Sequence, residues 1–201
     1  TEMDAAKPEL IPQPTAARQA LTERLIATGG TDLERWRDPA SVTGFWDARA
    51  AIAARYIPDG VCVLDLGAGA MELQRFLAAN CVYVPCDVVP RAPGALAADL
   101  NKGEFPAGTY DWITVLGVLE YIHDVGGLLA RMAGAAPNAI VTYCLDTAGI
   151  AAVRRGMGWV NDYDAASFCA LLDRSPWRAR DATLLKKGAH NEQVLFVLAR
   201  A

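Results

Sequence analysis

The sequence lacks the residue clusters that hold metal ions. It has only two histidines, His123 and His190, which stand far apart, and its five cysteines form no C-x-x-C pair. A zinc site needs several cysteine or histidine ligands close together, so no metal is expected. Three of the cysteines fall in apolar, strand-like segments. We expect the cysteines to be reduced and mostly buried, as in a cytoplasmic protein.

The sequence also lacks an excess of positive charge and any long uninterrupted apolar run. Its net charge is −4 and its pI about 5.2, which argues against a nucleic-acid partner. The longest apolar region, residues 125–145, is interrupted by Arg131, Pro137 and Asn138 and predicts helix, turn and strand rather than a membrane span. The amino terminus is charged and proline-rich, unlike a signal peptide, so a cytoplasmic location is expected.

The first part of the chain predicts an irregular arm followed by helices. The first 14 residues hold three prolines. Thr15 is placed to cap a helix that runs to Thr28 and ends at the glycine pair 29–30, and a polar connection follows. After Thr43, residues 44–57 predict a second helix, with Phe45, Ile52 and Tyr56 at helical spacing.

Strand and helix patterns then alternate, which indicates βαβ units and a mostly parallel sheet. The predicted strands are 61–66, 81–87, 95–99, 110–116 and 139–145, and the predicted helices are 71–80, 125–136 and 164–175. The helix over 125–136 is expected to be capped by Asp124. The last two strands, 178–187 and 192–200, predict an antiparallel hairpin at the edge of the sheet.

Ligands of open α/β sheets bind at the carboxyl ends of the strands, and glycines follow the first strand there. Gly67 and Gly69 allow a tight turn and a close approach of the backbone to a ligand. A dinucleotide-binding turn would need glycine at position 72, where Glu72 stands instead. An acid at this place repels a pyrophosphate, and the lysine of a P-loop is absent. Dinucleotides and nucleoside phosphates are therefore disfavoured.

Two further acids follow the next strands. Asp87 comes 22 residues after Asp65, the spacing that suits hydrogen bonds to ribose hydroxyls, although a loop-capping aspartate would look the same. Asp99 could accept a hydrogen bond from an adenine amino group, or could be a plain turn acid. A ligand with ribose and adenine, without phosphate and with positive charge at its other end, fits S-adenosyl-L-methionine.

These segments together resemble the class I S-adenosylmethionine-dependent methyltransferases over about residues 45–200. The matching motifs are VLDLGAGA (63–70), VYVPCD (82–87), ALAADL (95–100) and YDWITVLGVLEYIHD (110–124). Residues 99–111, DLNKGEFPAGTYD, are similar to the bacterial MetW-like subgroup. The resemblance implies a three-layer Rossmann-like α/β fold, with a mostly parallel seven-stranded sheet, an antiparallel C-terminal hairpin and N-terminal helices.

The resemblance also implies the parts of the chain and the cofactor site. Residues 1–43 would form an N-terminal arm and helix, a candidate lid, and residues 44–201 the methyltransferase domain. The implied cofactor-binding residues are Asp65, Gly67, Ala68, Gly69, Asp87, Val88, Asp99, Leu100, Leu116 and Gly117. Two positions depart from the family pattern: Met71 stands where a third glycine is common, and Tyr121 replaces the histidine of the LEH sequence. We predict that Met71 packs against the helix or the floor of the pocket.

Candidate catalytic residues follow the fourth strand. Methyl transfer is an in-line displacement that needs a general base only when the acceptor must lose a proton early. His123 is the candidate base, or else an exposed histidine beside Asp124. Glu120 and Tyr121 are expected to line the pocket, with helix capping as the alternative for Glu120.

The acceptor side of the pocket is predicted to be apolar and aromatic. The candidate aromatic residues, which could also be core or lid packing, are Phe45, Trp46, Tyr143, Trp159 and Tyr163. Arg154 and Arg155 are expected to be solvated, with attraction of an anionic acceptor as the alternative. The Asn/Asp-Pro-Pro-Tyr/Phe signature is absent after the fourth strand, which argues against amino methylation of adenine or glutamine.

These features predict a methyltransferase that acts on a small-molecule acceptor, most simply at oxygen. An alternative stays open from the sequence: a cofactor-binding, methyltransferase-like subunit or regulator of a partner enzyme, which would make a protein partner part of the function.

Overall fold

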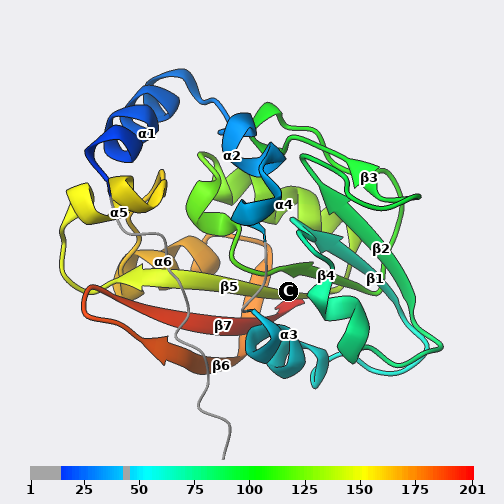
Figure 1. Cartoon of the computed structure of the whole chain (residues 1–201). Coiled ribbons are helices and arrows are strands. Elements are labelled where there is room, and N and C mark those ends of the chain that lie inside the picture. The colour runs from blue at the N-terminus through cyan, green and yellow to red at the C-terminus, as the bar shows by residue number, and fades with distance from the viewer. Residues whose placement is uncertain (1–14, 43–45) are drawn as a thin grey trace, which may run out of the picture.

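The computed structural model describes residues 15–42 and 46–201, which form a seven-stranded sheet flanked by helices (Figure 1). The strand order is β3-β2-β1-β4-β5-β7-β6. The strands are β1 (Cys62–Leu66), β2 (Val82–Asp87), β3 (Leu96–Ala97), β4 (Trp112–Val115), β5 (Asn138–Asp146), β6 (Trp177–Lys187) and β7 (Asn191–Arg200). Strands β1 to β5 pair in parallel, and β7 pairs antiparallel with both β5 and β6. The predicted fold class is confirmed.

Helices cover both faces of the sheet. The α-helices are α1 (Ala16–Thr28), α2 (Leu33–Arg37), α3 (Asp47–Ala54), α4 (Val125–Ala135), α5 (Ala151–Met157) and α6 (Ala165–Asp173). Short 3-10 helices are η1 (Pro39–Ser41), η2 (Glu72–Phe76), η3 (Leu100–Lys102) and η4 (Leu119–Tyr121). Helices α4 and α6 pack on one face, and α3 with η2 on the other. The result is the three-layer arrangement expected from the alternation of strands and helices.

The burial of β1 explains its continuous apolar sequence. Val63 packs into the core beside α3, whereas Leu64 and Leu66 pack into the larger core beside α4. Successive side chains of a strand point to opposite faces, so a strand covered on both faces needs apolar residues at every position. Asp65 interrupts this pattern at a position where β1 borders a cavity at the carboxyl ends of the strands.

Helix ends follow the capping signals of the sequence. The Thr15 hydroxyl accepts a hydrogen bond from the amide of Arg18 at 3.1 Å, and Gly29 ends α1 with φ of 67°. At α4, a carboxylate oxygen of Asp124 accepts from the amide of Gly127 at 2.8 Å. Each contact satisfies a backbone group that the first or last helical turn leaves without a partner.

Two local predictions need correction, and a third falls partly outside the described residues. The polar connection after Gly30 contains α2 and η1. The helix predicted for 71–80 is only the five-residue η2, because Met71 is left-handed and Leu77 is extended, and Phe76 is exposed. The helix after Thr43 is described from Asp47, while Thr43, Phe45 and the predicted arm over 1–14 lie outside the described residues.

The N-terminal cap, defined as residues 15–42, lies beside α5 and over the loops that follow the strands. Figure 1 shows α1 next to α5 at one end of the molecule, with α2 nearer the middle. The hydroxyl of Thr22 in α1 donates to the carbonyl oxygen of Arg155 in α5 at 2.9 Å. The cap also contacts a loop at the carboxyl ends of the strands, where Thr31 donates a hydrogen bond to Asp99.

Candidate functional site

A cavity opens at the carboxyl ends of β1, β2 and β4 and is roofed by the N-terminal cap. It encloses an empty volume of about 1250 Å³, its open mouth included. From β1 the chain first adds β2 and β3 on one side and then returns to add β4 on the other side. The strand order therefore reverses between β1 and β4, beside the cavity. Ligands of open α/β sheets bind at such a switch point.

Every residue that the sequence implied for cofactor binding lies on the lining of this one cavity. They are Asp65, Gly67, Ala68, Gly69, Asp87, Val88, Asp99, Leu100, Leu116 and Gly117. The fold therefore brings together loops from four strands in the way the motifs predicted. That these residues hold the cofactor stays a prediction, because no ligand contact tests it.

The loop after β1 is held tightly against β2. The amides of Gly67 and Ala68 donate to the carbonyl oxygen of Cys86 at 2.8 and 3.0 Å. Gly67 has φ of 74°, and a Cβ there would overlap the side chain of Val118. Glycine is thus required at this position both for the backbone conformation and for the close approach of the next loop.

Asp87, the last residue of β2, holds the loop after β1 through its carboxylate. One carboxylate oxygen accepts from the amide of Gly69 at 2.9 Å, and the other accepts from the amide of Val89 at 3.1 Å. The guanidinium of Arg91 lies 3.5 Å from the carboxylate, and it also donates to the carbonyl oxygen of Trp36 in the cap. The carboxylate is fixed at the cavity surface, where it has the remaining lone pairs to accept from ligand hydroxyls.

Asp65 is a buried acid on the cavity floor. The hydroxyls of Tyr83 and Thr114 both donate to it at 2.6 Å. Burial raises the pKa of Asp65, and the two hydroxyl donors and the positive charge of Arg49 oppose that rise. The same environment raises the pKa of the Tyr83 phenol, first through burial and then through the charge of Asp65. A positive ligand group at this place would favour the carboxylate form.

Asp99, at the end of β3, is buried to 7% exposure and already has partners. The hydroxyl of Thr31 donates to Oδ1 at 2.7 Å, and the amide of Asn101 donates to the same oxygen at 3.2 Å. Lys102 lies 3.7 Å from Oδ2. The capping of the following turn, which the sequence left as an alternative role, is therefore present, and Thr31 links the acid to the cap.

Sequence reasoning missed Arg49, which reaches the cavity from α3. Its guanidinium lies against Gly117, where a Cβ would overlap it, and 5.1 Å from the ring centroid of Trp46. The arginine occupies one position in an alanine-rich helix outside the four motifs. No pattern in the sequence distinguishes it from a surface arginine.

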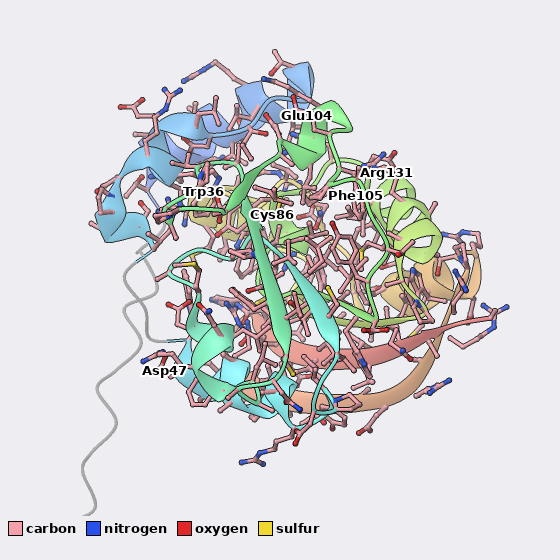
Figure 2. The ribbon with its side chains drawn as sticks, turned by 90° about the vertical axis from the view of Figure 1, so that its right-hand side faces the viewer. Trp36, Asp47, Cys86, Glu104, Phe105 and Arg131 are labelled. Carbon is pink, nitrogen blue, oxygen red and sulfur yellow. The ribbon has the colours of Figure 1, made fainter. Side chains whose placement is uncertain are left out.

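The cap contributes an aromatic and basic group that the sequence also did not reveal. Trp36 packs edge-on against Tyr121, with ring centroids 4.9 Å apart. The guanidinium of Arg35 lies 4.8 Å from the ring of Trp36 and 5.2 Å from that of Tyr121. Figure 2 shows Trp36 on the N-terminal segment, at the end of the sheet where Cys86 of β2 lies. All of these residues line the cavity.

The three candidate catalytic residues separate in space. Tyr121 lines the cavity, and burial raises the pKa of its phenol. Glu120 is 2% exposed and points away, where Oε1 accepts from the amide of Cys144 at 2.8 Å. His123 is not among the lining residues, and its Nε2 donates to the carbonyl oxygen of Gly30 at 2.9 Å. The geometry gives His123 a role in attaching the cap.

The predicted acceptor wall is largely wrong. Tyr143 is fully buried and stacks on Phe168 at 4.8 Å, and neither Tyr163 nor Trp159 lines the cavity. Of that set, Trp46 lines the cavity, and Phe45 lies outside the described residues. These aromatics lie in apolar segments that a sequence cannot assign to core or cavity.

The prediction that Arg154 and Arg155 are solvated fails for Arg154. Arg154 is 2% exposed, donates to the Tyr143 hydroxyl at 2.7 Å and to the carbonyl oxygen of Cys144 at 2.9 Å, and pairs with Asp162 at 3.1 Å. Arg155 also pairs with Asp162. These contacts of Arg154 attach the segment after α5 to β5. The Arg154 side chain does not line the cavity.

Three further features concern metal-ligating side chains, helix length and the cysteines. Within 15–42 and 46–201, no cluster of three or more metal-ligating side chains occurs. Over the same ranges, the helices are too short or too polar to span a membrane. All five cysteines are free thiols, and burial, with the charges of Asp87 and Asp65, raises the pKa of the Cys86 thiol to about 12. Only Cys86 and Cys144 are buried, whereas Cys62 and Cys81 are half-buried and Cys169 is exposed, so the prediction of mostly buried cysteines is wrong.

The sheet order, with the antiparallel hairpin inserted beside β5, defines the Rossmann-like methyltransferase class of folds. The family model described as "Methyltransferase domain" matches residues 34–179. The chain belongs to this family and is a class I S-adenosylmethionine-dependent methyltransferase. A comparison with curated protein sequences gives no match.

Solved structures with similar folds are also methyltransferases. The mitomycin 7-O-methyltransferase MmcR has 17% identity and a TM-score of 0.64, over 92% of this chain and 67% of that one. Magnesium protoporphyrin IX methyltransferase (ChlM) from Synechocystis PCC 6803 has 12% identity and a TM-score of 0.60, over 93% and 98%. The O-methyltransferase NcsB1 from neocarzinostatin biosynthesis has 16% identity and a TM-score of 0.62, over 92% and 68%. At these identities the likeness establishes the fold.

Proposed function

We propose that this methyltransferase uses S-adenosyl-L-methionine to methylate a small-molecule acceptor at oxygen. The observation that carries the proposal is the cavity whose lining includes Asp65, Asp87 and Asp99 together with the Trp36–Tyr121 pair. S-adenosylmethionine supplies a methyl group activated by a positively charged sulfur. The acids suit a ligand with ribose, adenine and positive charge, and the aromatic pair suits an organic acceptor.

The residues present fit each part of the cofactor. Asp87 would bind the ribose hydroxyls, and Asp99 the adenine amino group. Asp65 would lie on the side of the ammonium, whose charge favours its ionised form. Arg49, beside Gly117, would bind the methionine carboxylate, because a guanidinium matches a carboxylate in charge and shape. The backbone at Gly67 and Gly69 leaves space for close approach.

Oxygen as the methylated atom is supported by two of the neighbours, and a small organic acceptor by the makeup of the cavity. MmcR and NcsB1 are described as O-methyltransferases, and one NcsB1 structure contains 1,4-dihydroxy-2-naphthoic acid. In this chain the apolar and aromatic residues Leu25, Val118, Tyr121 and Val160 lie beside the proposed cofactor residues. Such a surface suits a small organic molecule.

The test begins with cofactor binding and proceeds to transfer. Calorimetry with S-adenosylhomocysteine should give binding to the full chain, and Asp87→Ala should weaken it by at least about tenfold, or roughly 1.4 kcal/mol. Asp59→Asn, at an exposed acid outside the cavity, is the matched control and should bind as the native chain does. Radiolabelled S-adenosylmethionine with phenols, carboxylates, amines and thiols then identifies the acceptor atom, and mass spectrometry of the product locates the methyl group.

Several outcomes contradict the proposal. Tight binding of NAD without S-adenosylhomocysteine binding would remove the cofactor assignment. Methylation of amines or thiols alone would remove oxygen as the acceptor atom. Absence of transfer to every compound, together with a stoichiometric partner in a pull-down, would favour a cofactor-binding subunit of another enzyme.

A further inference from the structure

The cavity lining carries charges of both signs. The acids Asp65, Glu72, Asp87 and Asp99 lie at the carboxyl ends of β1 to β3 or in the segments after them, whereas Asp32 comes from the cap and Arg49 from α3. Arg35 faces the cavity from the cap, beside Trp36 and Tyr121. The acids at the strand ends suit the positively charged cofactor of the proposed function, on which this inference rests. The role of Arg35 remains to be assigned.

Arg35 differs from the other arginines that hold the cap. Arg18 pairs with Asp32 at 2.6 Å, and Arg91 pairs with Asp87. Within 15–42 and 46–201, no carboxylate lies within ion-pair distance of the Arg35 guanidinium, whose only hydrogen bond runs from Nη1 to the carbonyl oxygen of Met157 at 2.9 Å. A half-buried guanidinium without a counter-charge retains donors for a ligand.

The acid that caps α2 is not available to balance this charge. Asp32 lies on the same turn, but one of its oxygens accepts from the amide of Arg35 at 3.1 Å and the other accepts from Arg18. Burial raises the pKa of the Tyr121 phenol, although the charge of Arg35 opposes that rise. Tyr121 is thus a neutral aromatic surface at neutral pH. A negative charge beside Arg35 must come from the ligand.

The surroundings of Arg35 define the shape of that ligand. The rings of Trp36 and Tyr121 meet edge to face at 88°, and the guanidinium lies within 5.2 Å of both. Leu25, Ile122 and Val160 add apolar surface nearby in the same cavity lining. Flat aromatic rings pack well on such a surface, and a carboxylate or phenolate on the ring can meet the guanidinium.

We propose that Arg35 forms an anion subsite for the acceptor, and that the acceptor is a flat aromatic molecule bearing a carboxylate or a phenolate. Arg35 and the Trp36–Tyr121 pair determine this specificity.

The test measures binding, so it does not depend on turnover. The full chain is saturated with S-adenosylhomocysteine and titrated by calorimetry with 2-naphthoate and with 2-naphthamide, which has the same ring and no charge. The native chain should bind 2-naphthoate at least about tenfold more tightly than 2-naphthamide. Arg35→Gln should reduce this ratio to about one, while affinity for 2-naphthamide stays within about threefold of native.

Two controls separate recognition from folding. Arg37→Gln changes an exposed arginine on the same helix that does not line this cavity, and it should keep the native ratio. Affinity for S-adenosylhomocysteine, measured first, reports whether each variant is folded and tests the proposed function by itself. If Arg35→Gln loses affinity for S-adenosylhomocysteine through misfolding, Arg35→Lys takes its place. Lysine keeps the charge but not the planar guanidinium, so its preference for 2-naphthoate over 2-naphthamide should lie between the native ratio and one.

The outcomes are decisive for the inference. Native binding of S-adenosylhomocysteine without preference for the anion overturns the subsite, and so does a ratio that Arg35→Gln leaves unchanged. Failure of both probes to bind overturns the flat aromatic class. Failure to bind S-adenosylhomocysteine instead counts against the proposed function.

Discussion

Met71 follows the glycine loop with φ of 60° and ψ of 36°. Among the described residues it is the only one other than glycine with positive φ. The left-handed conformation costs a side-chain-bearing residue roughly 1–2 kcal/mol, whereas glycine adopts it readily. Met71 does not line the cavity. The predicted contact with the floor of the pocket is therefore wrong, and packing against the following helix stays a prediction.

Replacement of Met71 by glycine and by alanine should separate backbone from side chain. At ordinary positions alanine is more stable than glycine by roughly 0.5–1 kcal/mol. At Met71 the order should reverse, and Met71→Gly should be more stable than Met71→Ala by about 1 kcal/mol in urea unfolding.

The control for this pair is Gln74, an exposed position of η2 whose φ is not positive. There the alanine variant should be the more stable of the two. Both Met71 variants should keep native affinity for S-adenosylhomocysteine. Loss of affinity in Met71→Gly would mean that the side chain contacts the cofactor directly.

Asp65 is the residue whose protonation should affect stability. Burial raises its pKa in the folded protein, so the folded state binds the proton more tightly than the unfolded state does. The resulting stability is present below the unfolded pKa of about 3.9 and is lost as pH rises through the raised folded pKa. Asp65→Asn should remove this loss, so the variant gains stability relative to the native chain as pH rises from about 4 to about 7.

Urea unfolding of both chains across that range measures the difference between them. Effects of other carboxylates cancel in the difference, because both chains share them. A difference that does not change with pH would contradict the raised pKa. Asp65→Asn should also weaken S-adenosylhomocysteine binding, since the variant cannot balance the ligand's ammonium.

At the scale of elements, the N-terminal cap is attached to the sheet through a few polar contacts. Gly30 and Thr31 meet His123 and Asp99, two residues that follow β4 and β3. Trp36 adds its ring contact with Tyr121. Few of these contacts bury much apolar surface. The free energy needed to detach the cap should therefore be smaller than the free energy needed to unfold the sheet.

His123→Ala should loosen the cap without removing a catalytic base. Loss of the bond to Gly30 should speed hydrogen exchange in α1 and α2, while the turnover rate stays within about threefold of native. A true general base would cost about 10²- to 10⁴-fold and change the pH–rate profile. His190→Ala, at an exposed histidine in the turn after β6, is the control and should alter neither exchange nor rate.

At the scale of the whole molecule, the proposed cofactor site lies between the N-terminal cap and the loops after the strands. The cavity is lined by loops after β1 to β4 and by the cap, so a ligand that fills it contacts both. Binding to the folded state alone raises the free energy of unfolding by about 2.7 kcal/mol at a concentration of 100 times Kd.

S-adenosylhomocysteine should therefore raise Tm of the full chain by roughly 5–10 °C at that concentration, given about 2–4 °C per kcal/mol for a chain of this size. Differential scanning calorimetry measures the shift. Asp87→Ala should show a much smaller shift at the same concentration. An equal shift with NAD or ATP would contradict a site specific for the phosphate-free cofactor.

Local patterns determined much of the fold and the cofactor end of the cavity. Each of these features lies within one short segment that consists of a strand and the loop after it. They are the apolar run of β1, the glycines after it, Asp87 and Asp99. A parallel sheet then brings the carboxyl ends of its strands to one edge, which is why residues from separate motifs meet in one cavity.

Only the tertiary structure decided which part of the chain faces those motifs. Thr31 meets Asp99 across 68 residues of sequence, and Gly30 meets His123 across 93. Arg35 and Arg154 are both arginines in short helices, yet one faces the cavity and the other is buried beneath β5. Their environments are set by the packing of distant elements, and so are the contacts of the N-terminal cap with the loops after the strands.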